Sequence, residues 1–149
     1  MSTPERRIIE VSGAEALWLL KGSVGGRLIH TRGEVAIVRP ATHILEYGRL
    51  IVRSPAPVAA FAEPVTVTYQ TDQVSVSAGR GWSVTATGPA EVIREPEQVA
   101  HYRRTLAGWI HGPHDTLIRV HPHAVQGHRL GIPAPSSAVT SGKDRPGLR

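Results

Sequence analysis

Strict alternation of apolar and polar residues is the feature that most constrains the fold of this chain. Residues 65–69 place two valines and a tyrosine on one face of an extended strand and two threonines on the other, and residues 74–78 repeat the pattern. A period of two is typical of a half-buried β-strand, whereas a helix would show a period near 3.6 residues. The segment therefore predicts two neighbouring strands that are joined across Thr71-Asp72.

Most of the remaining chain has the same strand character. Thr31-Arg32-Gly33 and Tyr47-Gly48 are turn sequences between apolar runs, and each predicts a hairpin. Further strands are expected at about residues 7–11, 27–30, 34–39, 43–46, 49–53 and 82–93, followed by a final strand pair between residues 116 and 130.

Two segments carry the end signals of short helices. Ser12 and Glu15 form a capping box, in which the serine accepts a hydrogen bond from the Glu15 amide and the glutamate reaches back, and Gly22 supplies a stop. Pro96 suits the first turn of a second helix over about residues 96–106. The expected apolar faces are Ala14, Leu17, Trp18 and Leu20 in the first helix, and Val99, Tyr102 and Leu106 in the second.

Six or more strands with two short helices predict a mainly β domain, built as an antiparallel barrel or sandwich. Strands this amphipathic need closure of the sheet, or a partner chain, to protect their edges. The 149 residues fit one folded domain, which we assign to residues 1–130. Residues 131–149 are rich in Pro, Ser and Gly without periodicity, so we expect a disordered tail there.

Composition excludes several classes of protein. The chain has no cysteine, which excludes disulfides, thiolate zinc sites and cysteine nucleophiles. No apolar run approaches the roughly 20 residues of a membrane span, and the first residues lack the apolar stretch of a signal peptide, so the cytoplasm is the expected location. A net charge of +5 suits an anionic partner, but no basic cluster or recognition-helix pattern favours nucleic acid.

The histidines do not form a metal-binding pattern. His111 and His114 flank Gly112-Pro113 in a loop rather than sharing a helix face, and His121-Pro122-His123 has no carboxylate cluster in the sequence around it. The nucleophile-elbow motif of serine hydrolases is also lacking. We therefore expect no metal and no hydrolytic triad.

The order of several short motifs resembles one known family. The motifs are Gly26-Arg27-Leu28, Arg39-Pro40-Ala41-Thr42-His43, Arg53-Ser54, Gly81-Trp82-Ser83-Val84, Thr87-Gly88-Pro89-Ala90-Glu91-Val92, and the closing run from Ile118 to Leu130. Over roughly residues 8 to 130 their order and spacing are similar to those of the actinobacterial flavin-binding split β-barrel family related to pyridoxamine 5'-phosphate oxidase.

The resemblance implies an antiparallel split barrel that forms a homodimer with a flavin in the crevice between the two barrels. The implied cofactor is FMN, with the deazaflavin F420 or no cofactor as alternatives. The implied activity is an oxidoreductase reaction on a small organic substrate, with the catalytic residues unassigned. The residues that correspond to the family's flavin site are Arg39, Pro40, Thr42, His43, Arg53, Ser54, Trp82 and Ser83.

One segment departs from the family's pattern. The family usually follows Arg-[Thr/Ser] with a Gly-[Thr/Ser]-Lys turn, whose lysine and hydroxyl groups hold the cofactor phosphate. This chain has Pro55-Ala56-Pro57-Val58 instead. Proline removes amide donors, and no lysine or hydroxyl replaces them. Phosphate contact would then depend on Arg53 and Ser54, with Arg39 as a further candidate.

Each of these residues also has a purely structural interpretation. Arg39 follows an apolar strand and could be a rim arginine that pairs with a carboxylate. Thr42 could cap a turn, and His43 could be an ordinary surface histidine. Trp82 could belong to the core, as aromatic residues on the apolar face of a strand usually do.

Three functions remain open on the sequence alone. The first is a flavin-dependent oxidoreductase, in which the flavin carries the chemistry and the protein supplies orientation and electrostatics. The second is a split-barrel protein that has lost the flavin and acts as a small-ligand binder or a non-redox enzyme, which the two prolines at 55 and 57 favour. The third is a basic nucleic-acid-binding or regulatory protein, supported only by the charge.

Overall fold

Eight strands form a single sheet in the computed structural model, which describes residues 7–108 and 112–131. Apart from Gly131, the residues expected to form a tail lie outside this range. The strands are β1 (Arg7–Val11), β2 (Gly25–Arg32), β3 (Val35–Glu46), β4 (Arg49–Ser54), β5 (Val65–Ser75), β6 (Arg80–Val92), β7 (Thr116–Val120) and β8 (Ala124–Gly131). The helices are α1 (Gly13–Lys21), the short 3-10 helix η1 (Val58–Phe61) and α2 (Pro96–Thr105).

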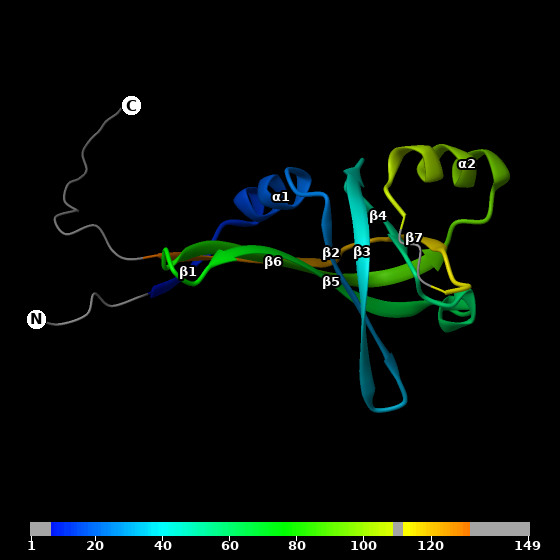
Figure 1. The fold of residues 1–149 in the computed structure, drawn as a ribbon, viewed down its shortest axis with the longest axis horizontal. Coiled ribbons are helices and arrows are strands. Elements are labelled where there is room, and N and C mark those ends of the chain that lie inside the picture. The colour runs from blue at the N-terminus through cyan, green and yellow to red at the C-terminus, as the bar shows by residue number, and fades with distance from the viewer. Residues whose placement is uncertain (1–6, 109–111, 132–149) are drawn as a thin grey trace, which may run out of the picture.

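The sheet closes on itself to form a barrel. Its strand order is β1-β8-β6-β5-β2-β3-β4-β7, and β7 also pairs with β6. The strands from β6 round to β7 therefore make a closed ring, while β8 and β1 extend the sheet beyond it (Figure 1). All of these pairings are antiparallel, which confirms the predicted antiparallel split barrel with two α-helices.

One strand serves both the ring and its extension. β6 pairs with β8 through residues 81–87 and with β7 through residues 90–92. Gly88 lies between these two segments, and a Cβ there would lie 2.1 Å from the carbonyl oxygen of His121. Glycine is thus needed where the chain between β7 and β8 crosses β6. The last two strands pair with opposite ends of β6 rather than with each other.

β5 continues past the turn that the sequence predicts at Thr71-Asp72, so that prediction is wrong. Thr71 is buried and its hydroxyl donates to the carbonyl of Gly25 at 2.7 Å, while Asp72 forms an ion pair with Arg27 of β2. These interactions with the neighbouring strand hold both residues in the extended conformation. The turn to β6 falls instead just before Arg80, where Gly79 adopts a φ of 65°.

The other predicted turns are confirmed. Tyr47 and Gly48 both have positive φ values, 53° and 75°, as the favoured two-residue hairpin turn requires. Gly33 has a φ of 63° in the turn between β2 and β3. β3 itself runs unbroken through Pro40, so the two strands predicted on either side of this proline are one strand.

Helix α1 begins at the predicted cap, but the face that it buries against the rest of the protein differs from the predicted one. The Ser12 side chain accepts from the Glu15 amide at 3.1 Å, whereas the Glu15 carboxylate pairs with Arg129 of β8 instead of reaching back. The buried residues of the helix are Ala16, Leu19 and Leu20. Of the predicted apolar face only Leu20 is buried, and Trp18 is 68% exposed, because the helix contacts β8 through Ala16.

Helix α2 packs on the outside of the barrel, beside β4 and β7 (Figure 1). Its predicted apolar face is confirmed, with Tyr102 and Leu106 buried and Val99 packed beside them. These side chains meet Ile51, Ile93 and Leu117 of the barrel wall and the segment after β6. Within the described ranges, no helix is long and apolar enough to cross a membrane.

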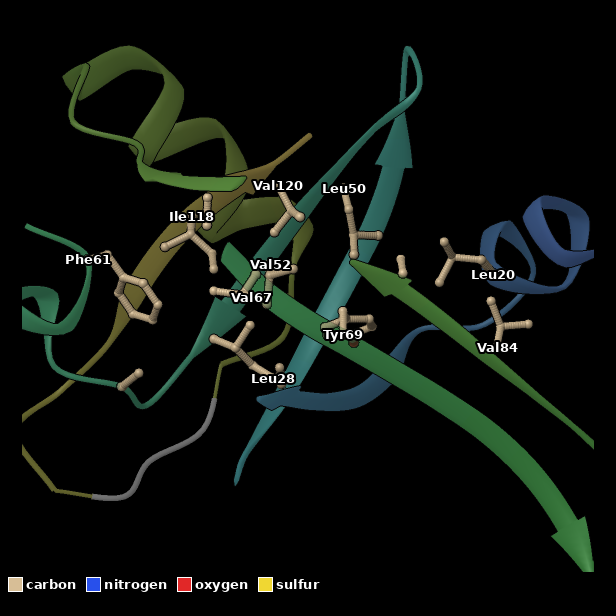
Figure 2. Close-up of a cluster of buried hydrophobic side chains, with 14 of the residues drawn as sticks. Leu20, Leu28, Leu50, Val52, Phe61, Val67, Tyr69, Val84, Ile118 and Val120 are labelled. Carbon is tan, nitrogen blue, oxygen red and sulfur yellow. The ribbon is translucent and has the colours of Figure 1, made fainter. Parts of the chain in front are cut away.

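The barrel interior is filled by one apolar cluster (Figure 2). Alternation along the strands points Val67 and Tyr69 of β5, and Val84 of β6, into this cluster. Leu20 of α1 joins it beside Val84, and Phe61 of η1 joins it on the side of Ile118. The two helical segments thus close parts of the interior that the strands leave open.

Replacing Gly26 with alanine is expected to lower the free energy of unfolding by about 1–3 kcal/mol, as overpacking in a core typically does. The added Cβ would lie 2.4 Å from the Gln70 carbonyl oxygen and 2.9 Å from the Tyr69 hydroxyl. Gly25→Ala is the matched control, since its Cβ would meet only the Ala41 carbonyl oxygen at 3.6 Å. Urea denaturation measures both variants, and equal losses would contradict the close approach at Gly26.

Candidate functional site

The structure separates the predicted site residues into two groups. Arg39, Pro40, Thr42, His43, Arg53 and Ser54 lie on β3 and β4, whereas Trp82 and Ser83 lie on β6. Strands β2 and β5 lie between β3 and β6 in the sheet. Within one chain, the fold therefore brings the first six residues to one region and leaves the other two in another.

Arg53 is the most completely bonded member of the first group. Its Nε and Nη2 donate to the two carboxylate oxygens of Asp115 at 3.0 and 2.8 Å. Its Nη1 donates to the carbonyl oxygens of Arg103 and Leu106 at 3.2 and 2.7 Å. The Arg53 side chain is only 15% exposed, and it holds the end of α2 against β4.

The residues around Arg53 fit its role of holding the end of α2 against β4. A Cβ on Gly108 would lie 2.5 Å from the guanidinium, so the chain after α2 lies directly on it. The hydrogen bond from Arg53 is the main reason that the pKa of Asp115 lies below its usual range, which keeps this carboxylate charged. A phosphate at Arg53 would have to displace Asp115, and the predicted phosphate contact stays a prediction.

The hydroxyl groups of the first group bind main-chain carbonyls. Thr42 donates to the carbonyl of Ala107 at 2.6 Å and helps to hold the segment after α2. Ser54 is 2% exposed and donates to the carbonyl of Pro40 at 2.9 Å, which ties β4 to β3. Both hydroxyls therefore have structural partners in the chain itself.

His43 lies in the core, where it is 1% exposed. Its Nε2 lies 3.0 Å from the Leu20 carbonyl oxygen and its Nδ1 lies 2.6 Å from the Tyr69 hydroxyl. A carbonyl only accepts, so Nε2 carries the proton and Nδ1 accepts from the tyrosine. Burial lowers the pKa of His43 and raises that of Tyr69, so both side chains are neutral at pH 7. The interpretation of His43 as a surface histidine is wrong, because these bonds tie α1, β3 and β5 together.

Arg39 is the member of the first group whose side chain has no assigned partner. It is half-buried, and its Nε is shielded from solvent without a hydrogen-bond partner among the described residues. No carboxylate in that part of the chain forms an ion pair with it, so the interpretation as a paired rim arginine has no support here.

Trp82 and Ser83 lie at the open end of the sheet, beside two cavities of about 700 and 420 Å³. Residues that line both cavities are Val74, Trp82, Arg129 and Leu130. Ile9 and Gln73 belong to the first cavity only, whereas Ile8, Ser83 and His128 belong to the second. Cavities of this size, with apolar and aromatic walls and a few polar groups, are typical of small-ligand sites.

Strands β1 and β8 supply cavity residues that sequence reasoning missed. Ile8 pairs with Leu130, and Ile9 with Arg129, across almost the whole length of the chain. A local pattern carries no information about such a distant pairing. The available signal was the adjacent Ile8-Ile9 pair, whose side chains are 73% and 55% exposed.

The closed ring with its two-strand extension defines the class of protein as a split barrel. The family model described as pyridoxamine 5'-phosphate oxidase matches residues 12–129, and the chain belongs to this family. The uncharacterized protein Rv0080 of Mycobacterium tuberculosis is 34% identical over 132 residues, which cover 84% of this chain and 87% of that protein. The family resemblance noted in the sequence is thereby confirmed.

Solved structures share the same fold. One is a protein of Corynebacterium glutamicum provisionally named pyridoxamine 5'-phosphate oxidase, with a TM-score of 0.68 and 23% identity over 90% of this chain and 98% of that one. Another is the FAD-binding protein of Mycobacterium smegmatis, with a TM-score of 0.62 and 24% identity over 80% of this chain and 96% of that one.

Arg53→Gln is expected to lower the free energy of unfolding by about 1–3 kcal/mol, because Asp115 and the carbonyls at the end of α2 lose their donors. Arg49→Gln is the matched control on the same strand: Arg49 is exposed, and the change should stay within about 0.5 kcal/mol. Urea denaturation at neutral pH measures both variants. Equal stability of the two would mean that the Arg53 guanidinium is free to serve a ligand.

Proposed function

We propose that this chain is a flavin-dependent oxidoreductase that acts on a small organic substrate. The observation that carries the proposal is the pair of cavities around Trp82 on a barrel of the pyridoxamine 5'-phosphate oxidase family. The name of the M. smegmatis structure, a FAD-binding protein, supports a flavin as the class of cofactor. The protein is proposed to act in the cytoplasm.

The cavity residues suit the parts of a flavin. Trp82 offers a flat aromatic wall to the isoalloxazine ring, and Ile8 and Leu130 add apolar surface. Ser83 and His128 offer hydrogen-bonding groups for the polar edge of the ring. When bound, the flavin would supply the transfer of a hydride or of electrons. The contribution of these residues would be to orient the ring and to keep water from it.

The residues that the family resemblance predicts to contact a phosphate affect which flavin this chain would bind. FMN ends in a phosphomonoester, which is best held by several donors. Here the prolines at 55 and 57 replace the usual turn, and Arg53 is bonded to Asp115. FAD spreads its negative charge over two phosphates and adds an adenine, so it depends less on a single phosphate turn. FAD is therefore a candidate beside FMN and F420.

A homodimer is part of the proposal. Among the described residues, the large hydrophobic side chains that are more than half exposed are Ile8, Ile9, Trp18, Val24, Val35, Val38, Tyr47 and Val76. Covering them with a second copy would remove apolar surface from water. A dimer would also allow the β3–β4 residues of one chain to approach the Trp82 cavities of the other, although they lie apart within one chain.

A binder of another small ligand in the same cavities is the second candidate. The observation that favours it is the bonding of Arg53 and Ser54, the two residues expected to contact the phosphate, to groups of the chain itself. In that case the cavity residues would keep their role in binding, and no redox chemistry would follow.

Purified protein is expected to bind at least one of FMN, FAD and F420, as seen in the absorbance spectrum and in fluorescence titration. Trp82→Ala should weaken that binding about tenfold or more, because the ring loses its aromatic wall. Leu17→Ala is the control, since Leu17 is exposed on α1, lines neither cavity and is not among the side chains assigned to the dimer surface. Failure of all three flavins to bind would reject the flavin proposal in favour of the second candidate.

Sedimentation at micromolar concentration is expected to show a dimer, because the exposed apolar side chains need a partner surface. The apolar residue Val38 of β3 is 54% exposed, and Val38→Asp should shift the equilibrium toward monomer if this face is covered. A monomeric wild-type protein at this concentration would contradict the dimer.

A further inference from the structure

The larger of the two cavities beside Trp82 has positive charge in its wall. Its volume is about 700 Å³, and two of its lining residues are ionisable, Arg80 of β6 and Arg129 of β8. None of the described residues that line it is acidic. A guanidinium stays charged in a protein, so the cavity presents two permanent positive charges to whatever enters it.

The strand register places both arginines beside Trp82 on one face of the sheet. Arg129 lies opposite Ile9 of β1 on one side and opposite Trp82 of β6 on the other, and Trp82 in turn lies opposite Gln73 of β5. Directly opposite residues of antiparallel strands share a face. Arg80 precedes Trp82 by two residues on β6, so it points to this face as well. The two arginines are therefore diagonal neighbours, within reach of one small ligand.

The described chain balances only one of these two charges. Arg129 forms an ion pair with Glu15 of α1 through its Nε, and its two Nη atoms make no hydrogen bond among the described residues. Arg80 is exposed and forms no ion pair with the residues that the structure describes. The net charge at the cavity is thus about +1. A carboxylate, with one negative charge, matches it better than a phosphomonoester, which carries about −1.5 to −2 at pH 7.

The uncharged part of the cavity wall is largely apolar. Trp82 supplies an indole ring, and Ile9 and Leu130 add aliphatic surface. Ile9 is 55% exposed, so this surface is open to a ligand. The Gln73 side chain, opposite Trp82, adds an amide that can both donate and accept a hydrogen bond. Such a wall suits a flat apolar body, and the arginines suit a carboxylate at its edge.

We propose that the larger cavity binds an organic monocarboxylate with a flat apolar body, and that such carboxylates are the class of substrate on which this chain acts. Arg80 and the Nη atoms of Arg129 would hold the carboxylate, and Trp82 would lie against the apolar body. The assignment as substrate rests on the proposed flavin-dependent function, whereas the binding of the carboxylate itself does not require a flavin.

The larger cavity adjoins the one to which the flavin ring is assigned. The ring is proposed to contact Ser83 and His128, which line the smaller cavity only. Trp82 and Leu130 line both cavities, so molecules bound in the two would be neighbours. A substrate must lie next to the flavin ring to exchange a hydride or electrons with it, and the larger cavity is the adjoining space that can hold one.

Matched pairs of a carboxylate and its neutral amide test the charge while the shape of the ligand stays nearly constant. Benzoate with benzamide, and indole-3-acetate with indole-3-acetamide, are titrated calorimetrically into the full chain, with and without FMN. At least one carboxylate is expected to bind about fivefold or more tightly than its amide, as a charge-assisted contact at a partly exposed site allows. Added sodium chloride should weaken the binding of the carboxylate and leave that of the amide unchanged.

Variants assign the preference for the carboxylate to the two arginines. Arg80→Gln should remove most of the preference, whereas Arg80→Lys keeps the charge and should retain part of it. Arg129→Gln should also lower the preference, with circular dichroism confirming that the variant folds without the pair to Glu15. Arg49→Gln is the matched control, because it removes the same charge from an exposed residue of β4 that lines neither cavity, and it should leave the preference unchanged.

The proposal is overturned if neither carboxylate binds more tightly than its amide, or if Arg80→Gln keeps the full preference of the wild type. It is also overturned if Arg80→Gln weakens the binding of FMN more than that of riboflavin, because Arg80 would then hold the phosphate of the cofactor. If a flavin binds and the carboxylates show no preference, the proposed function stands and the substrate class is wrong. If the carboxylates show the preference and no flavin binds, the proposed function fails and the carboxylate site stands.

Discussion

The pairing of β6 with two different strands is the constraint on which the rest of the structure depends. At one end β6 pairs with β7 and closes the ring, which leaves the ring without an unpaired edge and encloses the core. At the other end it pairs with β8, and this extension carries Trp82 and Ser83 to the open end of the sheet. A single strand therefore determines both where the core lies and where the candidate cavities form.

The partly buried arginines of the barrel are of two kinds: some form an ion pair with a carboxylate of the chain, and Arg39 has no partner among the described residues. Arg53 uses its guanidinium to hold Asp115 and the end of α2, which explains how a residue at a position expected to bind phosphate can serve the fold instead. Arg39 is half-buried without a partner among the described residues, and His30 beside it has the same deficit.

Family membership and site chemistry answer different questions about this protein. The match over residues 12–129 shows the ancestry and the fold, and a split barrel can carry several functions. The cavities around Trp82 carry the proposal of flavin binding, while the residues on β3 and β4 are largely occupied by bonds within the chain. In the proposed function the two groups act together only if a second copy brings them into contact, which would couple the assembly state to the function.

The sequence by itself determined the local elements and the family. The hairpin turn at Tyr47-Gly48, the cap at Ser12 and the start of α2 at Pro96 were predictable, because each signal lies within a few residues. Only the tertiary structure decided the features that depend on distant residues. These are the extended conformation at Thr71-Asp72, the exposure of Trp18, the burial of His43, the pairing of Arg53 with Asp115 and the pairing of β1 with β8. The physical reason is that contacts between strands far apart in sequence outweigh local propensity, and no local pattern records which partners will meet.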